Sequence, residues 1–246
     1  MHLDRTLSLG PLAFQGENAS VSRVVTASGE TLILKAGAAA REGEIVIALA
    51  AHQPFVPEFF GETAQGLFFS ELPGRNLAEA FEQSSKHHAR LAYALGEALH
   101  RIHTWEPPIE KPVTQWRDEA LARVKATALA HSGEPIKYDY SPFVGQDHAA
   151  LAAWVDVESA KTPHQLAFCH GDACLPNFMT DGGTITGVVD WGDGGWADPR
   201  FDLATTLWSL RRNGADDCQE HFLQGYGWEG GVASLALFEA FYTLWE

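Results

Sequence analysis

The composition of this chain indicates a folded, acidic protein. Of its 246 residues 46% are hydrophobic and 20% charged, which supplies a packed core and excludes disordered and low-complexity classes. The net charge of −15 disfavours nucleic acid and anionic membranes as partners and favours cationic ones, although on charge alone an acidic surface that maintains solubility is the simpler explanation. Three cysteines without a C-x-x-C pair, no apolar membrane span and no signal-peptide core at the N-terminus lead us to expect a cytoplasmic protein.

The first seventy residues alternate short β-type runs with turn signals. This pattern predicts an antiparallel sheet of about five strands that carries one helix. The expected strands span residues 6–14, 21–27, 31–35, 58–63 and 66–71, and the expected helix spans 39–51. Pro73-Gly74 is a turn signal that ends this part, so residues 1–72 are predicted to form a β-rich N-terminal lobe.

Helical periodicity dominates the remainder of the chain. Leu91, Leu95, Leu99 and Ile102 form one apolar stripe, which predicts a long helix over residues 87–103. Further helices are expected at 115–130 and 146–160. Buried strands are expected at 166–169 and 184–190, the latter paired through the Asp181-Gly182-Gly183 turn with 178–180. The predicted class is α+β, with a small N-terminal antiparallel β-sheet lobe and a larger, mainly helical C-terminal lobe at 73–246.

The residues that carry chemistry lie in two neighbouring segments. The first is His170-Gly171-Asp172 followed after four residues by Asn177, and thirteen residues later comes Asp190-Trp191-Gly192. Each triplet alone is a common turn signal. In this order and spacing they match the protein-kinase pattern H-R-D, Asn and D-F-G. Phosphoryl transfer needs one carboxylate to orient a hydroxyl and oxygen ligands to hold Mg²⁺, so the pattern predicts ATP and Mg²⁺ as cofactors. We expect His170 to be a hydrogen-bonded brace of the loop.

A partner for this segment is predicted in the N-terminal lobe. Lys35 ends an apolar strand, in the position of the third-strand lysine that contacts the α and β phosphates in kinases. Such a lysine needs a glutamate from the next helix, and Glu42 and Glu44 both lie there. Glu42 shares a helical face with Ile45 and Leu49, whereas Glu44 lies about 200° round the helix. The choice between them stays open.

Other nucleotide contacts are expected on either side of that strand. The 15–20 loop has one glycine and is no G-x-G-x-x-G loop, so phosphate contacts would come from backbone amides near Asn18 and from the Ser20 hydroxyl. Ser70, Glu71 and Leu72 follow the fifth strand and would form an interlobe hinge that offers backbone groups to adenine.

These motifs resemble those of the aminoglycoside phosphotransferase family, which shares the protein-kinase fold. Residues 170–179 are similar to the catalytic loop of bacterial kinases that modify the 3′ or 3″ hydroxyl of kanamycin or streptomycin, and 187–204 continue the match. The resemblance implies a protein-kinase-like two-lobe fold. It also implies the following roles: Asp172 as catalytic base, Asn177 and Asp190 as Mg²⁺ ligands, Lys35 with Glu42 at the ATP phosphates, and Asp202 as an anchor of the catalytic loop.

The acceptor half departs from the family pattern. Asp193 stands where members acting on kanamycin usually carry arginine, and Trp208-Ser209 replaces an Arg-Asp pair. An acidic pocket would attract a polycationic acceptor. Its candidate residues are Asp139, Asp147, Asp156, Glu158 and Glu246, and a helix face exposed to solvent explains each equally well.

We therefore expect a phosphotransferase that acts on an alcohol group of a small, cationic acceptor. An aminoglycoside is favoured, with antibiotic resistance as the role, and the protein is expected to be a monomer or weak dimer without nucleic-acid or membrane partners. Open alternatives are a kinase for choline, a sugar, a macrolide or homoserine, and a non-catalytic nucleotide-binding regulator. A metal-dependent hydrolase ranks last because the eleven histidines show no H-E-x-x-H spacing.

Overall fold

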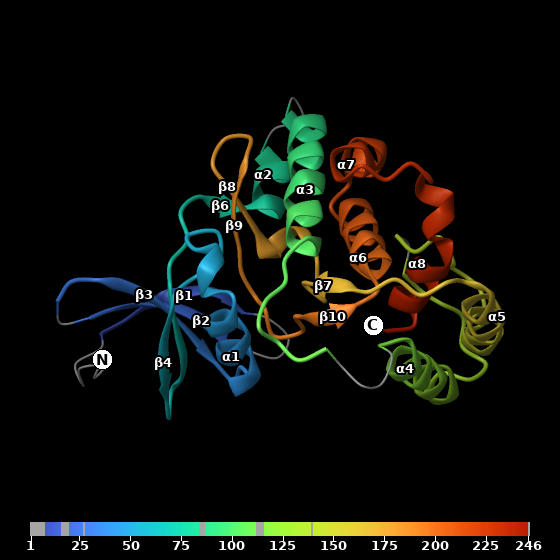
Figure 1. Cartoon of the computed structure of the whole chain (residues 1–246), viewed down its shortest axis with the longest axis horizontal. Helices are drawn as coiled ribbons and strands as arrows, with labels where there is room; N and C mark the ends of the chain where they lie inside the picture. The colour runs from blue at the N-terminus through green and yellow to red at the C-terminus, as the bar shows by residue number, and fades with distance from the viewer. Residues whose placement is uncertain are drawn as a thin grey trace.

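The structure is a computed structural model that describes residues 8–15, 20–26, 28–83, 87–111, 116–138 and 140–245. A β-sheet part and a helical part lie side by side, with the long helix α3 between them (Figure 1). The sheet has the order β1-β2-β3-β5-β4, and its strand pairs are antiparallel. Its strands are β1 (Ser8–Gln15), β2 (Ser20–Val25), β3 (Thr31–Ala36), β4 (Phe59–Thr63) and β5 (Gly66–Ser70).

The central strands of this sheet bury both of their faces. Leu32 and Leu34 of β3 pack with Phe68 in a small cluster, whereas Leu67 and Phe69 of β5 pack in the main core. This alternation follows from the period of two along a strand. Helix α1 (Ala40–Ala48) contributes to the same main core and is followed by a short 3-10 turn, η1 (Ala50–His52).

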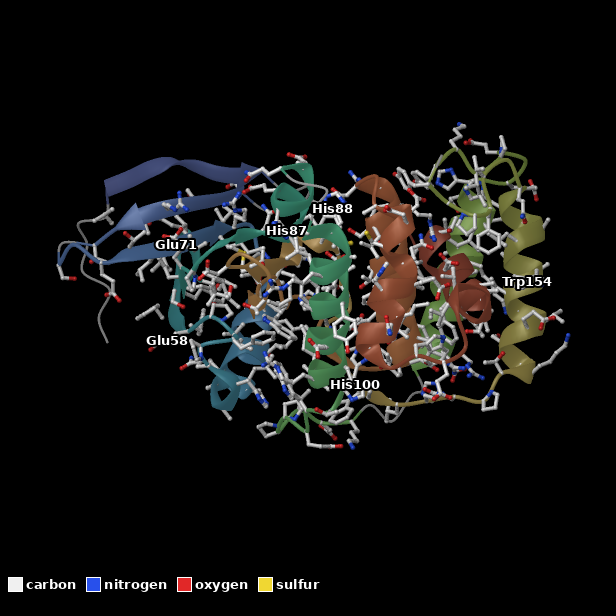
Figure 2. All side chains as sticks on the ribbon, turned by 90° about the horizontal axis from the view of Figure 1, so that it is seen from above. Glu58, Glu71, His87, His88, His100 and Trp154 are labelled. Carbon is white, nitrogen blue, oxygen red and sulfur yellow. The ribbon has the colours of Figure 1, made fainter. Side chains whose placement is uncertain are left out.

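The helical part is built around α3 (His88–His103), whose buried face carries the predicted leucine stripe. Its other helices are α2 (Leu77–Gln83), α4 (Trp116–Ala130), α5 (His148–Lys161), α6 (Pro199–Arg212), α7 (Gln219–Tyr226) and α8 (Ala236–Thr243). Viewed from above, α5 with Trp154 lies at the end away from the sheet, and Glu58 and Glu71 lie on the sheet side (Figure 2).

Short strands in the helical part support the chemical segments. A three-stranded sheet has the order β6-β8-β9, and a separate pair joins β7 to β10. Their bounds are β6 (Arg75–Asn76), β7 (Ala167–Cys169), β8 (Phe178–Thr180), β9 (Ile185–Val188) and β10 (Gly195–Ala197). The β8–β9 pair is the hairpin predicted at the Asp181-Gly182-Gly183 turn.

The predicted elements are present, with ends that differ by at most three residues. The strand expected at 184–190 ends at Val188, because Asp190 has φ of 62° and leaves the extended conformation. The short strands β6 and β10 were not predicted, since two or three residues are too few for a periodic signal. Within the described residues no helix is both long and apolar enough to cross a membrane. The lobe boundary at residue 72 stays a prediction.

Candidate active site

Lys35 connects the sheet to the helical part through two carboxylates. Its Nζ lies 2.8 Å from Oε2 of Glu42 on α1 and also pairs with Oδ1 of Asp190. Glu42 is 4% exposed, whereas Glu44 points to solvent. The structure therefore selects Glu42 as the partner of Lys35, as the shared face with Ile45 and Leu49 suggested.

Helix α1 can bring Glu42 to Lys35 because it lies close to β4 at Gly43. At Gly43, a Cβ atom would lie 2.8 Å from the Phe59 ring of β4. A larger side chain there would push the helix away from the sheet, and Glu42 with it.

The surroundings of Lys35 keep its amine charged. Burial alone would lower the pKa of Lys35, but the charges of Asp190 and Glu42 outweigh burial and raise it above 10.5. Burial acts in the opposite direction on Glu42 and raises the pKa of this carboxyl above 4.5, despite the nearby ammonium group. At neutral pH the site therefore presents a fixed cation, as phosphate binding requires.

Asp172 and Asn177 form one unit in the loop after β7. The Nδ2 group of Asn177 donates to the backbone oxygen and to Oδ2 of Asp172, both at 2.9 Å. This orientation turns Oδ1 of Asn177 away from Asp172. The backbone oxygen of Asn177 accepts from Val189 N at 2.9 Å, so the loop is tied directly to the residue before Asp190.

The donor set offered by Asn177 and Asp190 suits Mg²⁺. Asn177 contributes an amide oxygen, and Asp190 contributes a carboxylate on a side chain that is 45% exposed. Mg²⁺ prefers oxygen ligands and keeps several waters. Asp190 is also the one residue other than glycine that has a positive φ within the described ranges. Residues in such conformations often lie at functional sites.

His170 braces the loop, as predicted. Its Nε2 donates to Val189 O at 2.9 Å, and its Nδ1 accepts from Asp172 N at 3.2 Å. A carbonyl can only accept, so Nε2 is the donor of this ring, whereas Nδ1 accepts from a backbone N–H group. Both ring nitrogens are therefore engaged within the loop, and the role of Asp172 as catalytic base stays a prediction.

Asp202 on α6 anchors the same loop through hydrogen bonds of its carboxylate. Its carboxylate accepts from His170 N at 2.7 Å, from Gly171 N at 2.9 Å and from His103 Nε2 at 3.1 Å. Burial would raise the pKa of Asp202, but its bond to His103 and the other donors outweigh burial and lower the pKa below 3.8. The anchor is therefore ionised at neutral pH.

Two more residues of α6 hold the loop, a role that the sequence analysis did not predict for them. Thr206 Oγ1 donates to Ala173 O at 2.8 Å, and Ser209 Oγ accepts from Leu175 N at 2.9 Å. With Asp202 they occupy positions i, i+4 and i+7, one face of a helix. A polar stripe on an otherwise apolar segment was the signal that could have found them.

The side chains of the predicted hinge residues contact other parts of the protein. Ser70 Oγ accepts from Glu58 N at 2.9 Å, and Glu71 accepts from Arg23 Nε at 2.6 Å. Leu72 is buried against Gly187 of β9, where a Cβ atom would lie 2.6 Å from it. Their contacts to adenine, and the Ser20 hydroxyl at the phosphates, stay predictions, and Asn18 lies outside the described residues.

Three of the acidic residues considered for an acceptor pocket have structural partners. Asp147 accepts from Ala150 N at the start of α5, Asp156 pairs with Lys125 at 2.8 Å, and Glu158 pairs with Lys161 at 2.8 Å. Asp139 and Glu246 lie outside the described residues. Asp193 is an exposed acidic residue beside the loop, and its backbone oxygen would lie 2.3 Å from a Cβ at Gly171.

The family of the chain follows from its sequence together with this geometry. Residues 13–238 match the sequence profile of the phosphotransferase enzyme family. The chain belongs to this family. An aminoglycoside 3′-phosphotransferase of Niallia circulans is 39% identical over 75 residues, which are 30% of this chain and 29% of that relative. The aligned part thus spans less than a third of the relative.

Solved structures of aminoglycoside phosphotransferases share the fold. An aminoglycoside-3′-phosphotransferase of type VIII superposes with a TM-score of 0.72 at 23% identity, over 97% of this chain and 93% of that one. An aminoglycoside phosphotransferase from Streptomyces rimosus, solved with ADP and streptomycin, has a TM-score of 0.64 at 20% identity and covers 92% of this chain and 90% of its own. The predicted resemblance and the mixed fold, a sheet followed by helices, are confirmed.

Proposed function

We propose that this phosphotransferase moves the γ-phosphoryl group of Mg-ATP to a hydroxyl of a small cationic acceptor, an aminoglycoside of the kanamycin or streptomycin type. The observation that carries this proposal is the position of Lys35, whose ammonium group bridges Glu42 and Asp190. Asp190 follows the residue that is hydrogen-bonded to Asn177, which in turn holds Asp172. These contacts support the proposal, because they link the residues to which it gives the phosphate-binding, metal-binding and basic roles.

In the proposed reaction the acceptor oxygen attacks the γ-phosphorus in line. A new P–O bond forms, the bond to the β-γ bridging oxygen breaks with its electron pair leaving on ADP, and Asp172 receives the hydroxyl proton. The two hydrogen bonds from Asn177 orient Asp172 for this task, and Lys35 binds the phosphates. Asn177 Oδ1 and Asp190 would hold Mg²⁺, which when bound neutralises charge on the phosphate oxygens.

The charge of the chain supports a cationic acceptor. The net charge is −15, and Asp193, whose backbone lies against Gly171, is an exposed acidic residue. Negative potential around a site raises the local concentration of cations. The fold neighbour solved with ADP and streptomycin supports the same nucleotide and acceptor class. On this basis we propose antibiotic resistance in the cytoplasm as the biological role.

The test is a screen of the purified full-length chain with Mg-ATP. Kanamycin, streptomycin, choline, a macrolide and homoserine are tested as acceptors, with ADP release and the mass of the product as readouts, and Asp172→Asn serves as the inactive control. Phosphorylated kanamycin or streptomycin supports the proposal. Turnover with another acceptor alone would replace the acceptor class. Tight Mg-ATP binding without any phosphorylated product would favour the regulator and overturn the enzymatic proposal.

A further inference from the structure

A stack of aromatic rings connects the end of η1 to the turn that carries Asp190. The His52 ring lies on the Trp105 ring with centroids 3.8 Å apart and planes 10° apart. Trp105 in turn stacks on Trp191 at 5.8 Å and 29°. The Trp191 ring then contacts the His170 ring, with centroids 4.7 Å apart. We refer to His52, Trp105 and Trp191 as the aromatic column.

The column meets the proposed metal-nucleotide site at Trp191. This residue is fully buried, and its indole Nε1 donates to Val188 O at 2.9 Å. Trp191 directly follows Asp190, which pairs with Lys35. The position of the indole therefore bears on the backbone that carries Asp190.

Asp190 needs this support because of its backbone. A φ of 62° is uncommon outside glycine, although Asp tolerates it better than most residues. Such a conformation persists where the surrounding structure over-determines it. The next residue in the chain, Trp191, is fully buried, so the packing of its ring restrains the backbone that carries Asp190.

Trp105 fills the space between the two ends of the column. It is 7% exposed, and Phe55 closes its edge with ring centroids 6.1 Å apart. Phe55 is itself fixed: the Arg101 guanidinium lies 3.6 Å from the centre of its ring, and its backbone oxygen accepts from Val188 N at 2.8 Å. Removal of the Trp105 ring would therefore leave a void directly against Trp191, because its neighbours cannot move in.

We propose that Trp105 is a positioning residue for the metal-nucleotide site: by stacking on Trp191 it holds Asp190 in the orientation that pairs with Lys35, from which Asp190 would hold Mg²⁺. This inference rests on the proposed function. Trp105 lies after α3, outside the segments that match the kinase motifs, and nothing in its own chemistry concerns nucleotides. A purely structural tryptophan would stabilise the fold without affecting the metal dependence of nucleotide binding.

The experiment measures the Kd of ADP by calorimetry with and without Mg²⁺, on the full chain. Trp105→Leu removes the stacking plane, Trp105→Phe retains a ring, and His52→Ala removes the outer end of the column. Phe222→Leu is the matched control, because Phe222 of α7 is fully buried in the same core and lies outside the column. Thermal unfolding of each variant records the loss of stability.

Trp105→Leu should weaken ADP binding in the presence of Mg²⁺ by about tenfold, which is typical when a residue that orients a metal ligand is lost. Binding of ADP without Mg²⁺ should stay within about twofold, because Asp190 then has no metal to hold. Trp105→Phe should recover most of the loss, His52→Ala should show a smaller loss in the same direction, and Phe222→Leu should lower the Tm while it leaves the Mg²⁺ effect unchanged.

Two results would overturn the inference in distinguishable ways. If the wild-type chain binds Mg-ADP normally and the Trp105 and His52 variants keep its full Mg²⁺ effect, the positioning role is wrong while the proposed function stands. If the wild-type chain shows no Mg²⁺-dependent binding of ADP, the proposed function fails and the inference fails with it. If Trp105→Leu does not fold, Trp105→Phe and His52→Ala provide the same comparison.

Discussion

The ammonium group of Lys35 pairs with the carboxylate of Asp190, although 155 positions separate the two residues in the chain. This ion pair joins the β-sheet to the segment that carries the proposed metal ligand. Its two partners differ in exposure: the Lys35 side chain is 13% exposed and that of Asp190 is 45% exposed. The contacts around this junction lead us to expect four measurable effects of substitution.

Replacement of Lys35 by Ala should lower kcat/KM for Mg-ATP by about 100-fold, because the phosphates lose a buried, fixed cation. Steady-state kinetics with a saturating acceptor measure the change. Lys125→Ala is the control: Lys125 also pairs with a carboxylate, Asp156, but both groups are exposed, and kinetics close to wild type are expected. Equal losses in the two variants would contradict the role of Lys35.

Replacement of Asp172 by Ala should lower kcat about 1,000-fold, because the hydroxyl loses its general base. Mg-ADP binding should stay near wild type, since Asp172 is not a proposed metal ligand. Asp190→Ala should instead weaken Mg-ADP binding as well as turnover. Kinetics and calorimetry on the same preparations separate the two effects, and full activity in either variant would refute its assignment.

Replacement of Asp202 by Asn should destabilise the protein by about 2–3 kcal/mol near neutral pH, because an amide places an N–H group against a backbone donor that the carboxylate now satisfies. The pKa of Asp202 is lowered below 3.8 in the folded state. Its stabilising contribution is therefore present above about pH 4 and is lost as the pH falls through the lowered folded pKa.

Urea unfolding at several pH values tests this prediction of stability. The difference between wild type and Asp202→Asn in the free energy of unfolding should be constant between about pH 5 and 7 and should shrink at lower pH. A difference that grows on acidification would mean that Asp202 is not held ionised by its donors.

Replacement of Gly171 by Ala should impair both the fold and turnover. Gly171 has φ of 87°, and an added Cβ would lie 2.3 Å from Asp193 O. Gly29→Ala is a matched control with φ of 83° and nothing within 4 Å of the added Cβ. The control should cost about 1–2 kcal/mol from the backbone alone, whereas Gly171→Ala should cost more and also lower kcat. If Gly171→Ala and Gly29→Ala lowered the free energy of unfolding and kcat by the same amounts, the contact with Asp193 would be unimportant.

The sequence alone determined much of the β-rich part and the chemical segments. Alternation and turn residues placed the strands of the sheet, because each signal there is local. Asp172, Asn177 and Asp190 were found for the same reason: two lie on one loop, and a hairpin of fixed length leads to the third. The sequence did not predict the bounds of α6, because its residues from Pro199 to Leu210 are all buried and a helix without a solvent face shows no amphipathic period.

Only the tertiary structure decided which side chains face one another. It selected Glu42 over Glu44, gave Asp147, Asp156 and Glu158 structural partners, and stacked His52 on Trp105 and Trp191. None of these relationships follows from local spacing, because each depends on how the sheet, α1, α3 and α6 pack together. Propensity and periodicity describe one element at a time, whereas contacts between elements are set by the packing of the whole core.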